Sequence, residues 1–184
     1  LTTLVLSGNQ LGAESGKAIG AALDRNRQIK ADIEAAGKKD VGKALTGNSA
    51  AEWEKPAAEK AMVLLTSSER TATFIDLTPE QVLQLAKELE TNCTLTTLDL
   101  HDNQLDDECG KAIGAALEKN STLTSLDLRG CELGDESGKA IGAALEKNST
   151  LTTLNLWINQ LGDESGKVIG AALEKNSTLT SLDL

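Results

Sequence analysis

The chain has 184 residues and a formal net charge of −10, with 40% hydrophobic and 25% charged residues. This length suits one sizeable domain. The acidic balance argues against nucleic acid as a partner, because nucleic acid requires a basic face. No run of 18 apolar residues occurs, so no membrane-spanning segment is expected. With two Trp, one Phe and no Tyr, the core must be built from Leu, Ile, Val and Ala.

A strand-like motif recurs along the chain and is the first predicted element of each repeat. Apolar and polar residues alternate in it, as they do in a strand with one buried face. From residue 95 onward the copies follow one another every 28 residues. The copies are LTTLVL at 1–6, LTTLDL at 95–100, LTSLDL at 123–128, LTTLNL at 151–156 and LTSLDL at 179–184.

A short helix is predicted after each strand motif. Ile113 and Leu117, like their equivalents in the other copies, fall on one side of it. Asn120, Asn148 and Asn176 follow the helices, and Asn tolerates the left-handed backbone conformation that ends many helices. One strand and one helix per repeat predict a solenoid that curves as the repeats stack.

The repeat L-x-x-L-x-L-x-x-N/C-x-L resembles that of leucine-rich-repeat proteins, and its 28-residue length with a full helix is similar to their ribonuclease-inhibitor-like subclass. The resemblance covers about 1–30 and 70–184. It implies an α/β solenoid shaped like a horseshoe, with parallel concave strands, convex helices and helical capping segments. Members of this family include inhibitors, receptor sensor regions, a GTPase activator and actin-capping proteins, so the resemblance implies a fold more than a function.

Three segments are predicted along the chain. Residues 1–45 hold a repeat followed by a terminal helical cap, 46–69 a linker with a short helix, and 70–184 an N-capping strand–helix unit followed by leucine-rich repeats. Three accounts of this order stay open. The chain could hold two tandem blocks, it could be permuted or engineered so that 1–45 is the natural end of the array that 70–184 begins, or it could contain an inserted helical domain. The first two are favoured.

The start of the second block carries its own signals. Phe74, Ile75 and Leu77 predict its first strand. Thr78 then predicts the N-cap of a helix, with Pro in the first helical position and Gln81 reaching back to the cap.

Both ends of the sequence fall on strand motifs without a cap. An uncapped repeat exposes leucines and an unpaired strand edge. The solenoid could continue beyond this chain, its two ends could pair with each other, or the chain could self-associate through these ends.

Polar residues of the strand motifs are expected on the concave face, about 4.8 Å apart between neighbouring repeats. The threonine columns suit strands and are interpreted as structural. A further column carries carboxylates, which repel one another by on the order of 1 kcal/mol per adjacent pair. It is either a solvated structural row or part of a surface for a basic partner. Its members are Asp99, Asp127, Asn155 and Asp183.

The copies differ most at the two positions after the strand motif, whereas the helix sequence is nearly unchanged. Exposed Trp and Arg are residue types that dominate interface energies. These positions therefore predict a binding role, and the alternative is that a strand end accepts any residue. The pairs are His101 with Asp102, Arg129 with Gly130, and Trp157 with Ile158.

The sequence therefore indicates a protein-binding module and not an enzyme. His101 is the only histidine, and no nucleophile or acid–base pair stands out, so no catalytic or metal site and no cofactor are predicted. The expected partner is another protein with a basic surface, bound on the concave face. The alternative function is an assembly or structural scaffold, natural or engineered, without a specific ligand.

Cysteines and glycosylation sequons bear on the compartment. Three Cys without a CxxC pair favour reduced thiols in the cytoplasm. Cys131 takes the N/C position of the repeat and is expected to be structural. Sequons at Asn92, Asn120, Asn148 and Asn176 would crowd sugars along one edge, so a structural role at the helix ends is preferred.

Overall fold

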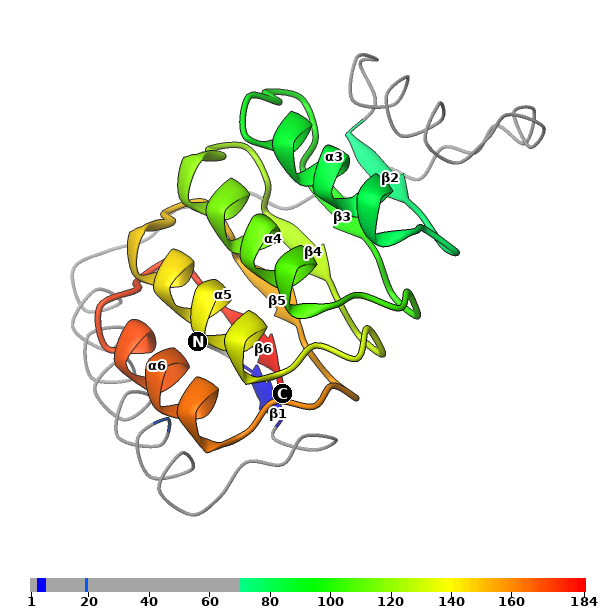
Figure 1. The fold of residues 1–184 in the computed structure, drawn as a ribbon. Helices are drawn as coiled ribbons and strands as arrows, with labels where there is room; N and C mark the ends of the chain where they lie inside the picture. The colour runs from blue at the N-terminus through cyan, green and yellow to red at the C-terminus, as the bar shows by residue number, and fades with distance from the viewer. Residues whose placement is uncertain (1–2, 6–18, 20–69) are drawn as a thin grey trace.

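The computed structural model describes residues 3–5, 19 and 70–184. One parallel sheet runs through this part of the chain, and helices pack side by side along one side of it (Figure 1). The strands are β1 Thr3–Val5, β2 Thr71–Thr73, β3 Thr97–Asp99, β4 Ser125–Asp127, β5 Thr153–Asn155 and β6 Ser181–Asp183. The helices are α3 Pro79–Leu89, α4 Asp107–Lys119, α5 Asp135–Lys147 and α6 Asp163–Leu173. The predicted solenoid is confirmed, whereas the predicted terminal cap and linker between 24 and 69 lie outside the described residues.

The register of the sheet places equivalent residues of successive repeats opposite one another. Leu98, Leu126, Leu154 and Leu182 form one continuous column through β3 to β6. All four are buried between the sheet and the helices. The 28-residue copying follows from this packing, because each repeat must fit the same neighbour on both sides.

The first strand of the chain lies beside the last. β1 pairs in parallel with β6, with Leu4 opposite Leu182, and the blue and red strands lie together in Figure 1. Ile19 is fully buried in the same hydrophobic core. A permuted order of the repeats would produce this arrangement. The pairing also occupies, within one chain, the edge of β6 that self-association would need.

The first strand of the second block lies earlier than predicted. β2 covers Thr71–Thr73, whereas the sequence predicted a strand over Phe74 to Leu77. Ala72 pairs with Leu98 and so takes the place of the central leucine of a repeat. The small alanine gave no strand signal, while Phe74 and Leu77 are buried just after the strand ends.

The predicted start of α3 is confirmed. Thr78 is the N-cap, and Pro79 opens the helix. The backbone N–H of Gln81 donates to Thr78 Oγ1 at 3.4 Å, and the N–H of Thr78 donates to Gln81 Oε1 at 2.8 Å. This reciprocal pair satisfies two backbone donors that the first turn leaves free.

The asparagines that follow the helices join each repeat to the one before it. The predicted left-handed conformation is wrong, because Asn120 and Asn148 have φ near −70° and ψ near 130°, which is extended backbone. Asn148 Nδ2 donates to Leu117 O at 2.7 Å and to Asn120 O at 3.2 Å. Its Oδ1 accepts from the N–H groups of Thr150 and Leu151 at 3.0 and 2.8 Å. The hydrogen bonds of one amide thus fix both the helix end and the stacking of the repeats.

The same contacts bear on the sequons. Asn120, Asn148 and Asn176 are buried, and each amide nitrogen donates to two carbonyls of the preceding repeat. A glycan would replace one of these donated hydrogens, so the folded repeat leaves no room for it. The structural interpretation of these three sequons is supported.

A second buried ladder lies just after the strands. Asn159 Nδ2 donates to Leu128 O at 2.9 Å, and its Oδ1 accepts from the N–H groups of Cys131 and Leu133. Cys131 takes the equivalent position one repeat earlier, where its thiol donates to Leu100 O at 3.0 Å. Cys131 is therefore structural, as expected, but a thiol is a weaker hydrogen-bonding group than an amide.

Replacing Cys131 with asparagine should raise the free energy of unfolding by about 1 kcal/mol, because an amide restores the stronger donors and acceptor of the ladder. Urea denaturation measures the change. Cys93→Ser is the control, since Cys93 is exposed and the other copies carry Ser there, and it should be neutral. A loss of stability in Cys131→Asn would show that the position is shaped for sulfur.

The starts of α5 and α6 are capped from the preceding repeat, whereas α4 is capped by its own Asp106, whose side chain accepts from the N–H of Cys109. Gly162 is the N-cap of α6 and has no side chain to offer. Asp135, in the first turn of α5, fills this role: its Oδ1 accepts from the N–H groups of Gly162 and Ser165 at 3.1 and 2.9 Å. Asp107 accepts from Ser137 in the same way. In α5 and α6 the contact thus links the helix to its neighbour and satisfies N–H groups at the start of the helix.

Candidate functional site

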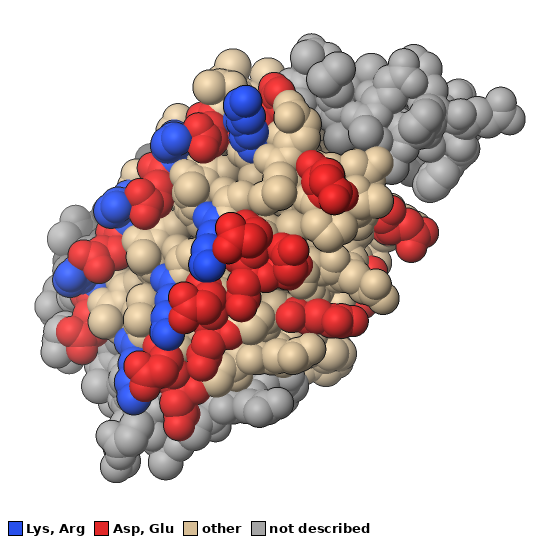
Figure 2. Space-filling model, viewed as in Figure 1, with Lys and Arg blue, Asp and Glu red and all other residues tan. Residues whose placement is uncertain are grey.

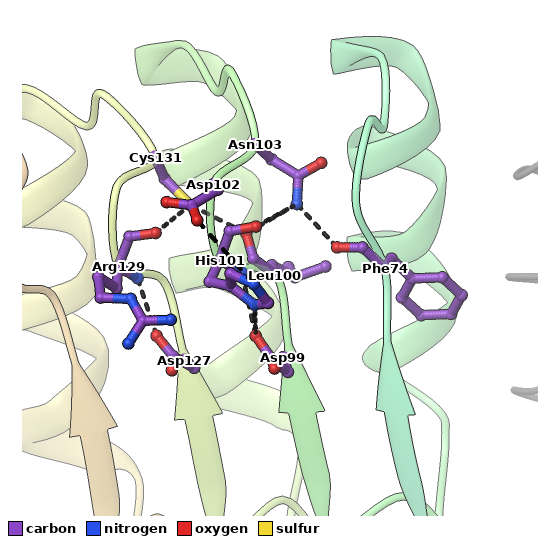
Figure 3. Close-up of polar contacts among 9 residues, drawn as sticks. All are labelled: Phe74, Asp99, Leu100, His101, Asp102, Asn103, Asp127, Arg129 and Cys131. Carbon is purple, nitrogen blue, oxygen red and sulfur yellow. Dashed lines mark hydrogen bonds and ion pairs between the residues drawn. The ribbon is translucent and has the colours of Figure 1, made fainter.

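The predicted strand-end residues lie side by side at the ends of β3, β4 and β5. We call them the strand-end row: His101, Asp102, Arg129, Gly130, Trp157 and Ile158. Backbone hydrogen bonds join them, since the N–H of Asp102 donates to Arg129 O at 2.8 Å and that of Gly130 donates to Trp157 O at 3.0 Å. Figure 3 shows the His101, Asp102 and Arg129 part of the row. The structure therefore brings these residues together on one rigid framework.

The carboxylate column, here called the acidic row, consists of the last residues of β3 to β6. In β3 to β5 these residues come two positions before the first residue of each pair in the strand-end row. The register aligns Asp99, Asp127, Asn155 and Asp183. In three of them one side-chain oxygen accepts from the backbone N–H two residues later. The bonded pairs are Asp99 with His101 at 3.1 Å, Asp127 with Arg129 at 2.9 Å and Asn155 with Trp157 at 3.0 Å. The acidic row thus positions the strand-end row, while Asp183 Oδ1 is buried without a hydrogen-bond partner.

His101 lies between two carboxylates. Its Nδ1 is 2.7 Å from Asp99 Oδ1, and its Nε2 is 4.0 Å from Asp102 Oδ2 (Figure 3). The hydrogen bond to Asp99 raises the pKa of the imidazole above 6.5; burial and Arg129 oppose this, and the charges of both carboxylates add to it. Within 3–5, 19 and 70–184, no group of three or more His, Cys, Asp or Glu residues could hold a metal ion.

The stability that His101 contributes should fall as the pH rises. A folded pKa above the unfolded one means that this contribution is fully present below the unfolded pKa and is lost as the pH passes the folded pKa. Urea denaturation from about pH 5 to pH 9 measures this effect. The free energy of unfolding of wild type should exceed that of His101→Gln most at low pH, and the difference should shrink above neutrality. A difference that grows with pH would contradict the assigned contacts.

The buried thiols are not candidate nucleophiles. Burial raises the pKa of Cys109 and of Cys131 to about 11, so both stay protonated near neutral pH. Both serve as packing and hydrogen-bonding groups in the repeats.

Trp157 and Ile158 form an exposed apolar pair at the end of β5. Trp157 is 38% exposed and Ile158 is 50% exposed. In the described part of the chain the other large exposed hydrophobic residues are Ile75 and Leu83, which stand apart from this pair in sequence. Adjacent exposed apolar side chains are a feature of contact surfaces.

Ile158 also has an unfavourable backbone conformation. Its φ is 54°, in the left-handed region, where a β-branched residue is an outlier. The equivalent residues of the other described repeats are Asp76, Asp102 and Gly130, which also have positive φ and tolerate it better. Ile158 therefore costs stability that the fold does not require. Comparing this column by residue type could have revealed the strain from the sequence, but this signal was missed.

Ile158→Asn should raise the free energy of unfolding by about 0.5–1 kcal/mol, since Asn relieves the strain at positive φ. Urea denaturation is the measurement. Ile75→Asn is the matched control, because Ile75 is equally exposed at 51% and does not have a positive φ, and it should give no gain. Equal changes in both variants would mean that exposure, not strain, sets the effect.

The helix side is charged in a different way. Figure 2 shows two rows in which basic and acidic side chains alternate across the helices. One row joins each repeat to the one before it, through Lys119–Glu90, Lys147–Glu118 and Lys175–Glu146. The other lies within helices, as Lys111–Glu108, Lys139–Glu136 and Lys167–Glu164. These exposed pairs contribute about 0–1 kcal/mol each, and each lysine of these two rows is already paired with a glutamate. Over the described residues, no helix is both long and apolar enough to cross a membrane.

Comparison with known proteins identifies a family and shows similarity to solved structures. A family model described as Leucine Rich repeat matches residues 1–20, 91–114, 119–142 and 147–170, which together make up half of the chain. A solved structure of leiomodin-1 actin-binding site 2 is similar, with a TM-score of 0.63 and 24% identity over 70% of this chain and 79% of that chain. At this identity the likeness concerns the fold alone. No curated protein sequence matches. The ribonuclease-inhibitor-like subclass stays a prediction.

Proposed function

The chain belongs to the leucine-rich-repeat family, and we propose that it is a protein-binding module whose contact surface is the strand-end row, centred on Trp157 and Ile158. The main observation that supports this proposal is the exposed apolar pair of Trp157 and Ile158. Trp is enriched among residues that dominate binding energy, and apolar area gains about 25 cal/mol per Å² when a partner removes it from water. Ile158 is strained where Asp or Gly serves the fold equally well, and a binding role accounts for its presence.

The framework under the surface supports the same proposal. Cross-repeat backbone bonds and the acidic row hold the strand ends in place before any partner arrives. A preorganised surface loses little conformational entropy on binding. The proposed role is non-enzymatic, and the cytoplasm is the proposed location because unpaired cysteines suit a reducing compartment.

The alternative of a scaffold without a ligand is less favoured, because it offers no reason for an exposed Trp beside a strained Ile. The partner is proposed to be a protein. The similar solved structure is named as an actin-binding site of leiomodin-1, so actin is the first purified protein to test, as a candidate only.

Affinity capture with matched variants tests the proposal. The immobilised wild-type chain, Trp157→Ala and Leu83→Ala are each exposed to purified actin and to proteins of the source cell. Leu83 is a suitable control because it is 41% exposed and lies on α3, away from the strand ends. Wild type and Leu83→Ala should retain the same partner, and Trp157→Ala should bind it at least tenfold more weakly. Equal binding by Trp157→Ala would refute the proposal.

A further inference from the structure

The exposed apolar pair stands at one end of a surface whose other end is acidic. Trp157 and Ile158 follow β5, whereas Asp99 ends β3 and Asp102 lies three residues further on. β4 separates the two strands, so at about 4.8 Å per strand the two ends are about 10 Å apart. The Asp102 side chain is 70% exposed. One partner segment can therefore reach both ends.

The charges between these ends favour a basic group. Three carboxylates, those of Asp99, Asp102 and Asp127, and one guanidinium, that of Arg129, lie at the ends of β3 and β4 (Figure 3). Arg129 donates its backbone N–H to Asp127, and no ion pair of its side chain with the described residues is found. His101 carries a charge only when protonated. On the helix side each lysine of the ion-pair rows has its own glutamate. The carboxylates at the ends of β3 and β4 thus outnumber the cations there, even when His101 is protonated between Asp99 and Asp102.

We propose that the partner presents a segment with an apolar side chain and an Arg or Lys about 10 Å apart, the apolar group on Trp157 and Ile158 and the basic group at Asp99 and Asp102. This inference rests on the proposed function and adds the chemistry of the partner. In an extended segment, 10 Å corresponds to about three residues. A cation at the β3 end meets the carboxylates of Asp99 and Asp102. It is opposed in part by Arg129, one strand away, and by His101 when that imidazole is protonated.

Short labelled peptides test the inference directly. The first has two leucines, two serines and two arginines in that order, so that the inner leucine and arginine are three residues apart. The second replaces the arginines with glutamates, and the third replaces the leucines with serines. All carry the same fluorescent label and blocked ends. Fluorescence anisotropy with the full 184-residue chain should show the first peptide binding at least tenfold more tightly than either of the others.

Conservative variants locate the basic group. Asp102→Asn keeps the shape, and Asn also tolerates the φ of 54° at this position. This variant should bind the arginine peptide about threefold to fivefold more weakly than wild type. It should bind the glutamate peptide as tightly as wild type or slightly more tightly. Arg129→Gln should tighten binding of the arginine peptide, because it removes a positive charge one strand away from the proposed basic group. Glu108→Gln, on the helix side, is the control and should bind both the arginine peptide and the glutamate peptide as wild type does.

Two results would overturn the inference. One is equal affinity for the arginine and glutamate peptides, and the other is the absence of measurable binding of the arginine peptide at about 1 mM. An unchanged affinity in Asp102→Asn would likewise place the basic group elsewhere. The proposed function fails by a different observation, the full retention of a partner by Trp157→Ala. Binding that depends on Trp157 but not on charge would therefore refute this inference alone.

Discussion

Replacing Gly138 with alanine should lower the free energy of unfolding by about 1–2 kcal/mol. A Cβ at this position would lie 2.4 Å from Ser165 Cβ and 2.8 Å from Leu161 Cδ2, so α5 and α6 would have to move apart. Overpacking of this kind costs about 1–3 kcal/mol, and it exceeds the gain of about 1 kcal/mol that Gly→Ala brings inside a helix. Thermal and urea denaturation measure the loss.

Gly142→Ala is the matched control on the same helix. There an added Cβ would meet the Val168 Cγ1 methyl at 3.0 Å and the backbone N of Ile169 at 3.1 Å, contacts that a shift of a few tenths of an ångström relieves. Its stability should stay within about 1 kcal/mol of wild type. If Gly138→Ala were as stable as Gly142→Ala, close packing of helices through glycine would not be what sets their spacing.

Replacing Asn148 with alanine should cost about 3–4 kcal/mol. The change removes the hydrogen bonds of one buried amide and leaves two carbonyls and two backbone N–H groups of adjacent repeats without this partner. Each unsatisfied buried group costs about 1–3 kcal/mol, though relaxation and water entry reduce the sum. Urea denaturation should show the loss, and hydrogen exchange should be faster at Thr150 and Leu151.

Ser149→Ala serves as the control for the asparagine ladder. Ser149 is the next residue and is exposed, so its replacement should change the free energy of unfolding by less than about 0.5 kcal/mol. A similar small loss in Asn148→Ala would contradict the assigned role of the ladder in joining the repeats.

The fold could be predicted from the sequence because the strand motif occurs five times. A period of 28 residues with alternating leucines predicts one buried strand face, and the sheet register confirms it at Leu98 and its equivalents. Local signals also succeeded, as at the Thr78 capping box. The pairing of β1 with β6 was one of several open accounts, because identical motifs carry no information about which copy is the neighbour.

What the sequence did not predict depends on contacts between repeats. Asn148 was assigned a role in its own helix end, whereas two of its partners belong to the preceding repeat. β2 was misplaced because Ala72 replaces the expected leucine. The members of the strand-end row were predicted as a group, but the positive φ of Ile158 was not. Its binding role stays a proposal.

One measurement tests the central claim most directly: the stability and the partner affinity of Ile158→Asn, determined together. The account predicts that this variant is more stable than wild type by about 0.5–1 kcal/mol and yet binds the partner at least several-fold more weakly, because the strain serves binding and not folding. A variant that is stabilised and binds the partner as tightly as wild type would contradict the claim that the strand-end row is the contact surface.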